Sequence, residues 1–381
     1  MKIDDKTSHN SPSLRFPEFT GEWEKCKLGT LATKVGSGST PKGGDAVYTS
    51  IGHYFVRSQN VGMGFLMLDN IAHINDDIHQ KHKATEIYEN DVLLNITGAS
   101  IGRTAVATKE LEGGNVNQHV CIIRTNSKVN PKFLCDYIQT QRIQNHIKSL
   151  QTGGSREGLN FEQIRSFPIS LPSINEQNKL TCLLDKINER IATQVRLIDR
   201  LQSLMIGIAQ KIAHSNKPNV RISDCLECSS SALQESEVNK TGKYPVYGAN
   251  GIVGYIDKYH TQNEAIYIIK DGSGVGGVSY VTGKCSSTGT LNILQAKNGH
   301  SLKYLYYLLK VFNFEPYKTG MAIPHIYFKD YGKAKIFCPA YPEQLEYAKL
   351  LSSIDGNLRI ALDSLKNFNL QKQYLLRHML I

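Results

Sequence analysis

The sequence predicts an α+β protein. We expect two mixed α/β domains separated by two long antiparallel helices that pair as an intramolecular coiled coil, with a pseudo-twofold repeat relating the halves. Three observations predict this fold. A P-x-x-x-E-Q motif begins at Pro172 and again at Pro339, 167 residues later. A long amphipathic segment follows each copy. The segments before the two copies are rich in Gly, Ser, Thr, Asn and Tyr, and contain short β-type runs.

The composition limits the class of protein. At roughly 150 residues per domain, the 381 residues correspond to two or three domains. A hydrophobic fraction of 40% is too high for a disordered chain. No apolar run approaches the roughly 18 residues of a membrane span, and residues 1–20 lack the apolar core of a signal peptide. We therefore expect a cytoplasmic protein, and its net charge of +10 is consistent with a polyanionic partner.

The repeat divides the chain into five parts. We expect an N-terminal arm at 1–19, a first mixed domain at 20–172, a central helix at 173–214, a second mixed domain at 215–339 and a C-terminal helix at 340–381. The central helix leads into the second domain and the C-terminal helix leaves it. If that domain lies at one end of the pair, the two helices must be antiparallel.

Both helical segments carry a heptad pattern of apolar residues. The spacing alternates between four and three over four heptads, which packs one helix along another. Fourteen of the sixteen positions are apolar, and the exceptions are Gln194 and Lys372. Two ordinary amphipathic helices that cover separate cores are the alternative. The expected helix–helix packing residues are Ile187, Ile191, Ile198, Leu201, Met205, Ile208, Ile212, Ile354, Leu358, Ala361, Leu365, Phe368, Leu375 and Met379.

The two mixed domains have a similar order of expected strands and helices but different residues in them. Short β-type runs occur at Val92–Ile96, Val120–Ile123 and Ala265–Ile269. Each domain also contains one candidate amphipathic helix, at Pro131–Lys148 and at Ser301–Phe312. This organisation favours two modules that do the same work on different targets.

Several motifs occur in a characteristic order. They are Leu14–Phe19 followed by Trp23 and Leu28–Gly29, Gly98–Gly102 followed by Asn117–His119, Gly153–Arg156 followed by Leu159–Phe161, and, in the second domain, Tyr244–Gly251, Asp271–Gly272 and Ser287–Gly289. With the doubled P-x-x-x-E-Q motif, which is the most distinctive feature, this order resembles the specificity subunit of a type I restriction–modification enzyme. The resemblance covers nearly the whole chain.

This resemblance implies a DNA sequence-specificity subunit. Two target recognition domains would each read one half of a bipartite, asymmetric site in double-stranded DNA, and the paired helices would set the distance between the halves. The helices would also dock two methyltransferase subunits, which restriction/translocase subunits would join. Adenine-N6 methyl transfer with S-adenosylmethionine, and cleavage with ATP and Mg²⁺, would take place on those partners. The chain itself would carry no catalytic residue, cofactor or metal.

Motifs for catalysis on this chain are missing from the sequence. An adenine methyltransferase needs an N/D-P-P-F/Y/W loop, and the sequence contains no Pro-Pro pair. The glycine-rich stretches at Gly36–Gly38 and Gly272–Gly277 do not match G-x-x-x-x-G-K-[ST], so we interpret them as turns between strands. A coiled-coil DNA-binding regulatory protein without methyltransferase partners remains the alternative function.

The cysteines do not indicate a disulfide framework. The eight are scattered, and only Cys225 and Cys228 form a C-x-x-C pair. A zinc site would need a second pair or paired histidines. Reduced, buried thiols are therefore the preferred interpretation.

Candidate DNA-binding residues are polar side chains in the expected loops, because Arg, Lys, Asn, Gln, Ser and Thr contact base edges and phosphates. The alternative for each is a turn or surface residue without a DNA contact. Arg156 and Lys318 are favoured, because each lies beside a Thr-Gly pair that the repeat shares. The candidates are Ser37, Ser39, Thr40, Lys42, Asn60, Thr97, Ser100, Arg103, Asn117, Gln118, Ser155, Arg156 and Asn160 in the first domain, and Tyr247, Asn250, Lys270, Ser273, Thr288, Thr290, Lys318, His325 and Lys329 in the second.

Overall fold

A computed structural model of the chain describes residues 11–151, 158–214, 217–272, 274–320 and 323–381. The chain divides into two compact units. Unit 1 comprises Met1–Ala192 with Lys366–Ile381, and unit 2 comprises Thr193–Leu365. Within the described ranges, no helix is both long enough and apolar enough to cross a membrane.

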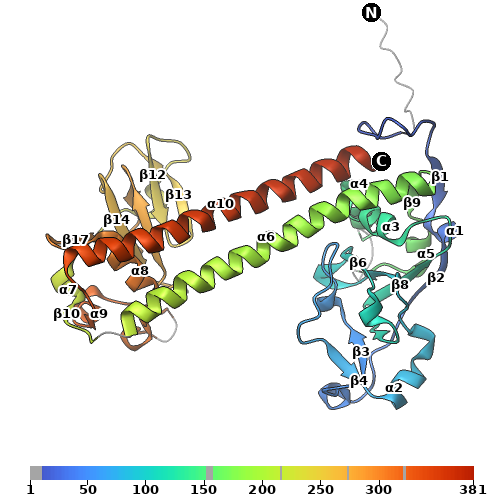
Figure 1. Ribbon diagram of the computed structural model, residues 1–381, viewed down its shortest axis with the longest axis horizontal. Helices are drawn as coiled ribbons and strands as arrows, with labels where there is room; N and C mark the ends of the chain where they lie inside the picture. The colour runs from blue at the N-terminus through green and yellow to red at the C-terminus, as the bar shows by residue number, and fades with distance from the viewer. Residues whose placement is uncertain (1–10, 152–157, 215–216, 273, 321–322) are drawn as a thin grey trace, which may run out of the picture. The chain divides into compact units, whose positions relative to one another are not determined.

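Two long helices contribute to both units. Helix α6 (Ile174–His214) has 41 residues and α10 (Tyr341–Met379) has 39, so each is roughly 60 Å long at the usual rise per residue. Their segments lie side by side within each unit and run in opposite directions (Figure 1). The predicted antiparallel pair of long helices is confirmed.

Within the described residues, the mixed domain of unit 1 contains three sheets. The four-stranded sheet has the order β2-β8-β5-β6 with antiparallel neighbours. A three-stranded sheet has the order β4-β3-β7, in which β3 and β7 are parallel, and β1 pairs with β9. The strands are β1 (Glu24–Lys27), β2 (Ala32–Ser37), β3 (His53–Val56), β4 (Ala72–Ile74), β5 (Val92–Asn95), β6 (Thr104–Val106), β7 (Asn115–Val116), β8 (Val120–Thr125) and β9 (Pro168–Leu171).

The helices of this domain are short, and one of them corrects a prediction. The helix expected at Pro131–Lys148 is two helices, α3 (Pro131–Ile138) and α4 (Gln141–Ser149). The break follows from Thr140, whose hydroxyl accepts the Ile143 N–H and so caps a new helix. The remaining helices are α1 (Leu28–Leu31), α2 (Asp76–Lys81), α5 (Phe161–Arg165) and the 3₁₀ turns η1 (Gly44–Val47), η2 (Ser58–Asn60), η3 (Lys83–Thr85), η4 (Gly98–Ser100) and η5 (Lys109–Leu111).

The described part of the mixed domain of unit 2 also contains three sheets, with the orders β11-β17-β14-β15, β13-β12-β16 and β10-β18. The predicted helix at Ser301–Phe312 is α8 (Leu302–Val311), which Ser301 caps. The strands are β10 (Val220–Arg221), β11 (Leu226–Ser230), β12 (Tyr244–Gly248), β13 (Gly251–Ile256), β14 (Glu264–Ile269), β15 (Val278–Thr282), β16 (Ser286–Ser287), β17 (Leu291–Ala296) and β18 (Lys335–Ile336). The other helices are α7 (Ile222–Cys225), α9 (Phe328–Tyr331), η6 (Glu235–Glu237) and η7 (Glu315–Tyr317).

The two mixed domains share one topology. Strands β2, β8, β5 and β6 of unit 1 correspond in order and direction to β11, β17, β14 and β15 of unit 2. The parallel pair β3·β7 likewise has its counterpart in β12·β16. Each unit has its own apolar core. The predicted repeat is therefore a repeat of the fold, although few residues agree between the halves.

Candidate nucleic-acid interface

Loops at the ends of three strands meet in unit 1, and they carry many of the candidate residues. The Gly38 N–H, just after β2, donates to the Asn117 carbonyl, just after β7, at 3.1 Å. The Thr40 N–H donates to the Gln118 side-chain oxygen at 2.9 Å. The Ile96 N–H, just after β5, donates to the His119 carbonyl at 3.0 Å. The structure therefore brings together three polar segments that are far apart in the sequence.

Gly38 makes the close approach of these loops possible. A Cβ atom at position 38 would lie 1.7 Å from the carbonyl oxygen of Val116, so only glycine fits. Gly36, two residues earlier in β2, has no atom within 4 Å of the equivalent position. Of the two glycines in Gly36–Gly38, only the second is required by the packing of the backbone.

His119 belongs to this group of loops, and sequence reasoning missed it as a separate candidate. Its Nδ1 atom lies 2.6 Å from the Thr97 hydroxyl, and its Nε2 atom lies 3.3 Å from the Gln118 side-chain nitrogen. The residue is half-buried. His119 ends the Asn117–His119 motif, but no local pattern pairs it with Thr97, which lies at the end of a different strand.

Some candidates of unit 1 are buried, which limits what they can contact. Asn60 is 2% exposed, and its side chain accepts from the Arg57 N–H and donates to the Met67 carbonyl. Asn117 is 6% exposed and accepts the His119 N–H. These two side chains shape loops from inside the domain.

The other candidates of unit 1 lie at or near the surface. Asn160 is exposed, but it caps α5 by accepting the Gln163 N–H. Ser155 and Arg156 lie outside the described residues. The exposed candidates are Ser39, Thr40, Lys42, Arg103 and Gln118, and the half-buried ones are Ser37, Thr97 and Ser100.

The corresponding loops of unit 2 also meet. The Lys270 N–H, just after β14, donates to the Thr290 carbonyl at 3.0 Å. The Thr288 N–H, just after β16, donates to the Tyr247 carbonyl at 2.9 Å, and the hydroxyls of Thr288 and Thr290 lie 2.8 Å apart. The Gly289 N–H donates to the Leu233 carbonyl, which follows β11. Equivalent strand ends therefore gather polar residues in both units.

A histidine–aspartate contact lies beside these loops. His325 Nδ1 is 2.6 Å from an oxygen of Asp271, and both side chains are about one-third exposed. Backbone hydrogen bonds in both directions tie His325 to Thr319. Asp271 belongs to a motif of the sequence but was not a candidate, because nothing in the local pattern pairs it with His325.

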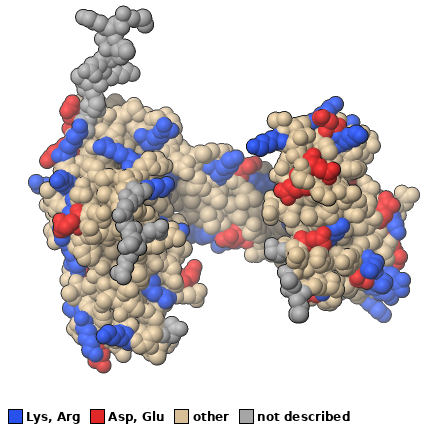
Figure 2. Space-filling view, turned by 180° about the vertical axis from the view of Figure 1, so that it is seen from behind, with Lys and Arg blue, Asp and Glu red and all other residues tan. Residues whose placement is uncertain are grey.

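The remaining candidates of unit 2 vary in their surroundings. Lys318 forms an ion pair with Glu315 at 2.6 Å, and Lys329 lies over the ring of Tyr327. Asn250 and Thr290 are exposed, whereas Thr288 is 3% exposed. Ser273 lies outside the described residues. On the face shown in Figure 2, lysine and arginine side chains of both units are spread among acidic ones. No single basic patch dominates this face.

The glutamine of each P-x-x-x-E-Q motif joins a long helix to its domain. Gln344, 2% exposed, accepts the backbone N–H of Ser301, which caps α8, and donates to the Pro339 carbonyl. Gln177, fully buried, does the same with Asn130, which caps α3, and with the Pro172 carbonyl. The motif predicted the start of a helix, but its glutamine also fixes that helix to the domain.

The heptad residues predicted to pack the long helices together are all buried or half-buried. The two polar positions of the heptad pattern have hydrogen-bond partners. Lys372 donates to the Gln139 side chain at 3.2 Å, and Gln194 donates to the Ala361 carbonyl. The buried seam residues are Ile187, Ile198, Met205, Ile212, Ile354, Leu358, Ala361 and Met379, and the half-buried ones are Ile191, Leu201, Ile208, Leu365, Phe368 and Leu375.

Comparison with known proteins gives consistent matches. The family model described as "Type I restriction modification DNA specificity domain" matches residues 20–203 and 215–367. The specificity subunit of the type I restriction enzyme EcoprrI from Escherichia coli is 25% identical over 112 residues, which cover 29% of this chain and 28% of that protein. The EcoBI specificity subunit from Escherichia coli is 24% identical over 135 residues, covering 35% and 28%. The matched part of the chain thus spans less than a third of each relative.

Two solved structures share the fold. The S subunit of a type I restriction–modification system from M. genitalium superposes with a TM-score of 0.68 at 17% identity, covering 97% of this chain and 99% of that one. A chain from a study of complex assembly and conformational transition of the type I R-M system gives a TM-score of 0.54 at 17% identity, covering 93% and 96%. The similarity therefore extends over both units and both long helices.

Proposed function

Because the chain belongs to the type I restriction modification DNA specificity domain family, we propose that it is the DNA sequence-specificity subunit of a type I restriction–modification complex. In this proposal residues 20–172 and 215–339 are target recognition domains, each reading one half of a bipartite, asymmetric site in double-stranded DNA. Residues 173–214 and 340–381 are the spacer helices, and 1–19 is an N-terminal arm. The observation that carries the proposal is one sheet topology used twice, with different polar residues at the equivalent strand ends.

The proposed DNA contacts are the loops that meet after β2, β5 and β7, and after β11, β14 and β16. Their hydroxyl, amide and ammonium groups match the donors and acceptors that contact base edges and phosphates. Asn60, Asn117 and Thr288 are omitted from the direct contacts because they are buried, and His119 is added. Arg156, Ser155 and Ser273 remain proposed contacts on the sequence argument alone.

We further propose that the two long helices dock methyltransferase subunits. Both helices expose large apolar side chains, and a partner subunit that covered them would remove that apolar surface from water. The chemistry would reside on those partners, with S-adenosylmethionine on the methyltransferases and ATP and Mg²⁺ on the restriction subunits, and this chain would be non-catalytic. The exposed side chains include Val195, Leu197, Leu204 and Ile206 on α6, and Leu345, Leu350, Ile360 and Leu362 on α10.

A domain exchange tests the two-module proposal. Residues 20–172 are replaced by the corresponding domain of another family member, and the methylated sites of the host genome are mapped before and after the exchange. We expect one half of the recognition site to change and the other half, with the gap, to stay the same. A change in both halves would contradict separate reading by two domains.

Copurification separates this function from the alternative. A tagged full-length chain is isolated from its host, and the copurifying proteins are identified by mass spectrometry. The proposal requires a methyltransferase subunit in the complex. A DNA-binding coiled-coil regulator would be isolated without one, and that result would reject the proposal.

Arg156 allows a test at a single side chain. The substitution Arg156→Ala in the complex is expected to weaken binding to its DNA site by about 1–3 kcal/mol if the guanidinium contacts a base edge. Arg142→Ala, which removes an exposed arginine of α4 outside the proposed loops, serves as the control for loss of charge. Equal affinities for both variants would remove Arg156 from the proposed contacts.

A further inference from the structure

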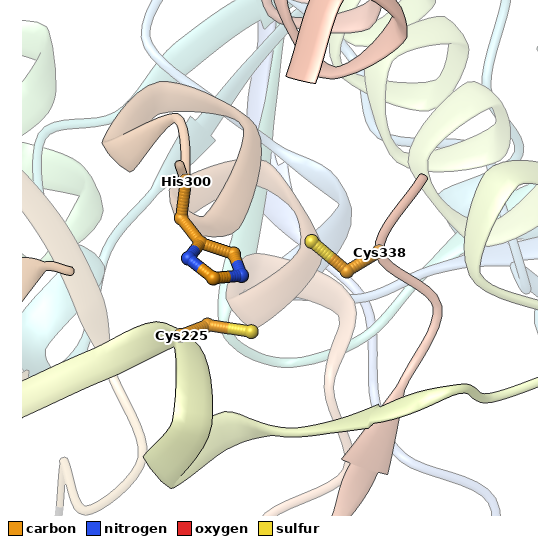
Figure 3. A group of neighbouring side chains, drawn as sticks. All are labelled: Cys225, His300 and Cys338. Atoms are coloured by element: carbon orange, nitrogen blue, oxygen red, sulfur yellow. The ribbon is translucent and has the colours of Figure 1, made fainter. Parts of the chain in front are cut away.

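Three potential metal ligands converge in unit 2, outside the proposed DNA interface. Cys225 ends α7, His300 directly precedes the cap of α8, and Cys338 directly precedes the proline of the second motif. Their ligand atoms all lie within 4.8 Å of one another. Figure 3 shows the two sulfur atoms and one nitrogen of the imidazole ring turned toward the same space.

These side chains are not engaged elsewhere among the described residues. Both cysteines are buried and free, at 0% and 8% exposure. His300 Nδ1 is buried without a hydrogen-bond partner among the described residues.

The repeat supplies an internal comparison for this cluster. Leu31 of unit 1 corresponds to Cys225, because its carbonyl accepts the Asn126 N–H just as the Cys225 carbonyl accepts the Lys297 N–H. Val129 precedes the cap of α3 as His300 precedes the cap of α8. Leu171 precedes Pro172 as Cys338 precedes Pro339.

The equivalent position of unit 1 is therefore an ordinary apolar core. Leu31, Val129 and Leu171 are between 2% and 8% exposed and belong to one buried cluster. Unit 2 has two thiols and an imidazole in place of these three aliphatic side chains. Packing alone does not explain this exchange, since the same frame is already filled by apolar residues in unit 1.

We propose that Cys225, His300 and Cys338 bind one Zn²⁺ ion. Two thiolates and one imidazole are a common zinc ligand set, with a water molecule at the fourth position. On binding, the two thiols release their protons to solvent, so affinity rises with pH. The ion would link α7, the start of α8 and the segment that enters α10, and the Gln344 side chain already joins the last two of these.

Metal analysis of the full-length chain tests this site. The protein is purified with a reductant that does not bind metals, incubated with Zn²⁺ and then freed of excess metal. Its zinc content is measured by elemental mass spectrometry. The expected result is about one zinc per chain. The triple variant Cys225→Leu, His300→Val and Cys338→Leu copies the residues of unit 1 and should retain less than about a tenth of that amount.

Cys228→Ser is the matched control, because Cys228 completes the C-x-x-C with Cys225 but does not belong to the cluster. This variant should bind as much zinc as the wild type. Substitution with Co²⁺ gives a second readout. A thiolate-to-cobalt charge-transfer band should appear in the wild type and the control at a lower Co²⁺ concentration than in His300→Val, which keeps both thiolates but loses one ligand. That single substitution keeps the proposal testable if the triple variant does not fold.

Two outcomes would overturn the proposal. One is a wild-type chain that binds neither Zn²⁺ nor Co²⁺ while its thiols are kept reduced. The other is zinc binding that persists in the triple variant or disappears in Cys228→Ser. The site is independent of the proposed DNA-binding role, so its failure leaves that role untouched.

Discussion

Gln194 Nε2 donates a 3.1 Å hydrogen bond to the main-chain carbonyl of Ala361, and the two residues are 167 positions apart. This separation equals the offset between the two P-x-x-x-E-Q motifs. Gln194 of α6 and Ala361 of α10 are therefore equivalent positions on two antiparallel helices. In an antiparallel pair of repeated helices, equivalent positions lie opposite each other at only one level. At that level the polar side chain of Gln194, which lies between the helices, has a main-chain carbonyl as its hydrogen-bond partner.

Replacing Gln194 by leucine is expected to stabilise the protein. A polar residue in a helix seam fixes the register but lowers stability. The free energy of unfolding of Gln194→Leu should rise by about 1 kcal/mol in urea titrations followed by circular dichroism. Gln202→Leu, at an exposed position of the same helix, should change it little. A loss of stability in Gln194→Leu would mean that the hydrogen bond contributes more than apolar contact at this position.

The two anchoring glutamines should contribute to stability in the same way. Gln344→Ala leaves the Ser301 N–H and the Pro339 carbonyl without this partner. We therefore expect the free energy of unfolding to fall by about 2 kcal/mol. Gln177→Ala should have a similar effect in unit 1. The sole tryptophan, Trp23, is buried in the core of unit 1, so its fluorescence reports the effect of Gln177→Ala. A transition that is unchanged in both variants would contradict the anchoring role.

A pair of glycine substitutions tests how the loops of unit 1 are held together. Gly38→Ala places a methyl group against the Val116 carbonyl and should cost about 2 kcal/mol or more, because backbone atoms on both sides must move. Gly36→Ala meets no atom and should be nearly neutral. Tryptophan fluorescence during urea unfolding measures both variants. Similar free energies of unfolding for the two variants would mean that the close contact between these loops does not stabilise unit 1.

Asp136 makes the stability of unit 1 depend on pH. Burial raises its pKa from 3.8 to about 7, and Lys372 opposes part of that shift. Between these values the folded state holds a proton that the unfolded state has released, so this carboxyl group lowers stability as the pH rises toward 7. Asp136→Asn removes the titration. The free energy of unfolding of Asp136→Asn, relative to that of the wild type, should therefore increase from pH 4 to pH 8 by up to about 4 kcal/mol.

The measurement for Asp136→Asn is urea unfolding at several pH values, followed by the fluorescence of Trp23. Asp363→Asn, at an exposed position of α10 in unit 2, is the control and should show the same pH dependence as the wild type. An advantage of Asp136→Asn that is constant across this range would show that the carboxyl group is ionised throughout, and would contradict the raised pKa.

The sequence by itself determined the architecture of this protein. The doubled motif, the heptad spacing and the β-type runs are local or periodic patterns, and they predicted two long antiparallel helices and two mixed domains. One local detail was wrong, because the helix expected at Pro131–Lys148 is interrupted where Thr140 caps a second helix. Family resemblance rested on the order of the same motifs, so it too was accessible from the sequence.

Only the tertiary structure decided which of those residues meet. Gly38 and Asn117 are joined by backbone packing between strand ends, and no spacing along the chain encodes that contact. Asn60 has the residue type of a DNA contact but is used inside its domain. The sequence pattern paired Cys225 with Cys228, whereas the fold places it beside His300 and Cys338. Periodicity specifies which face of an element is buried, but a binding site forms from segments that are distant in sequence and is determined when the sheets and helices pack.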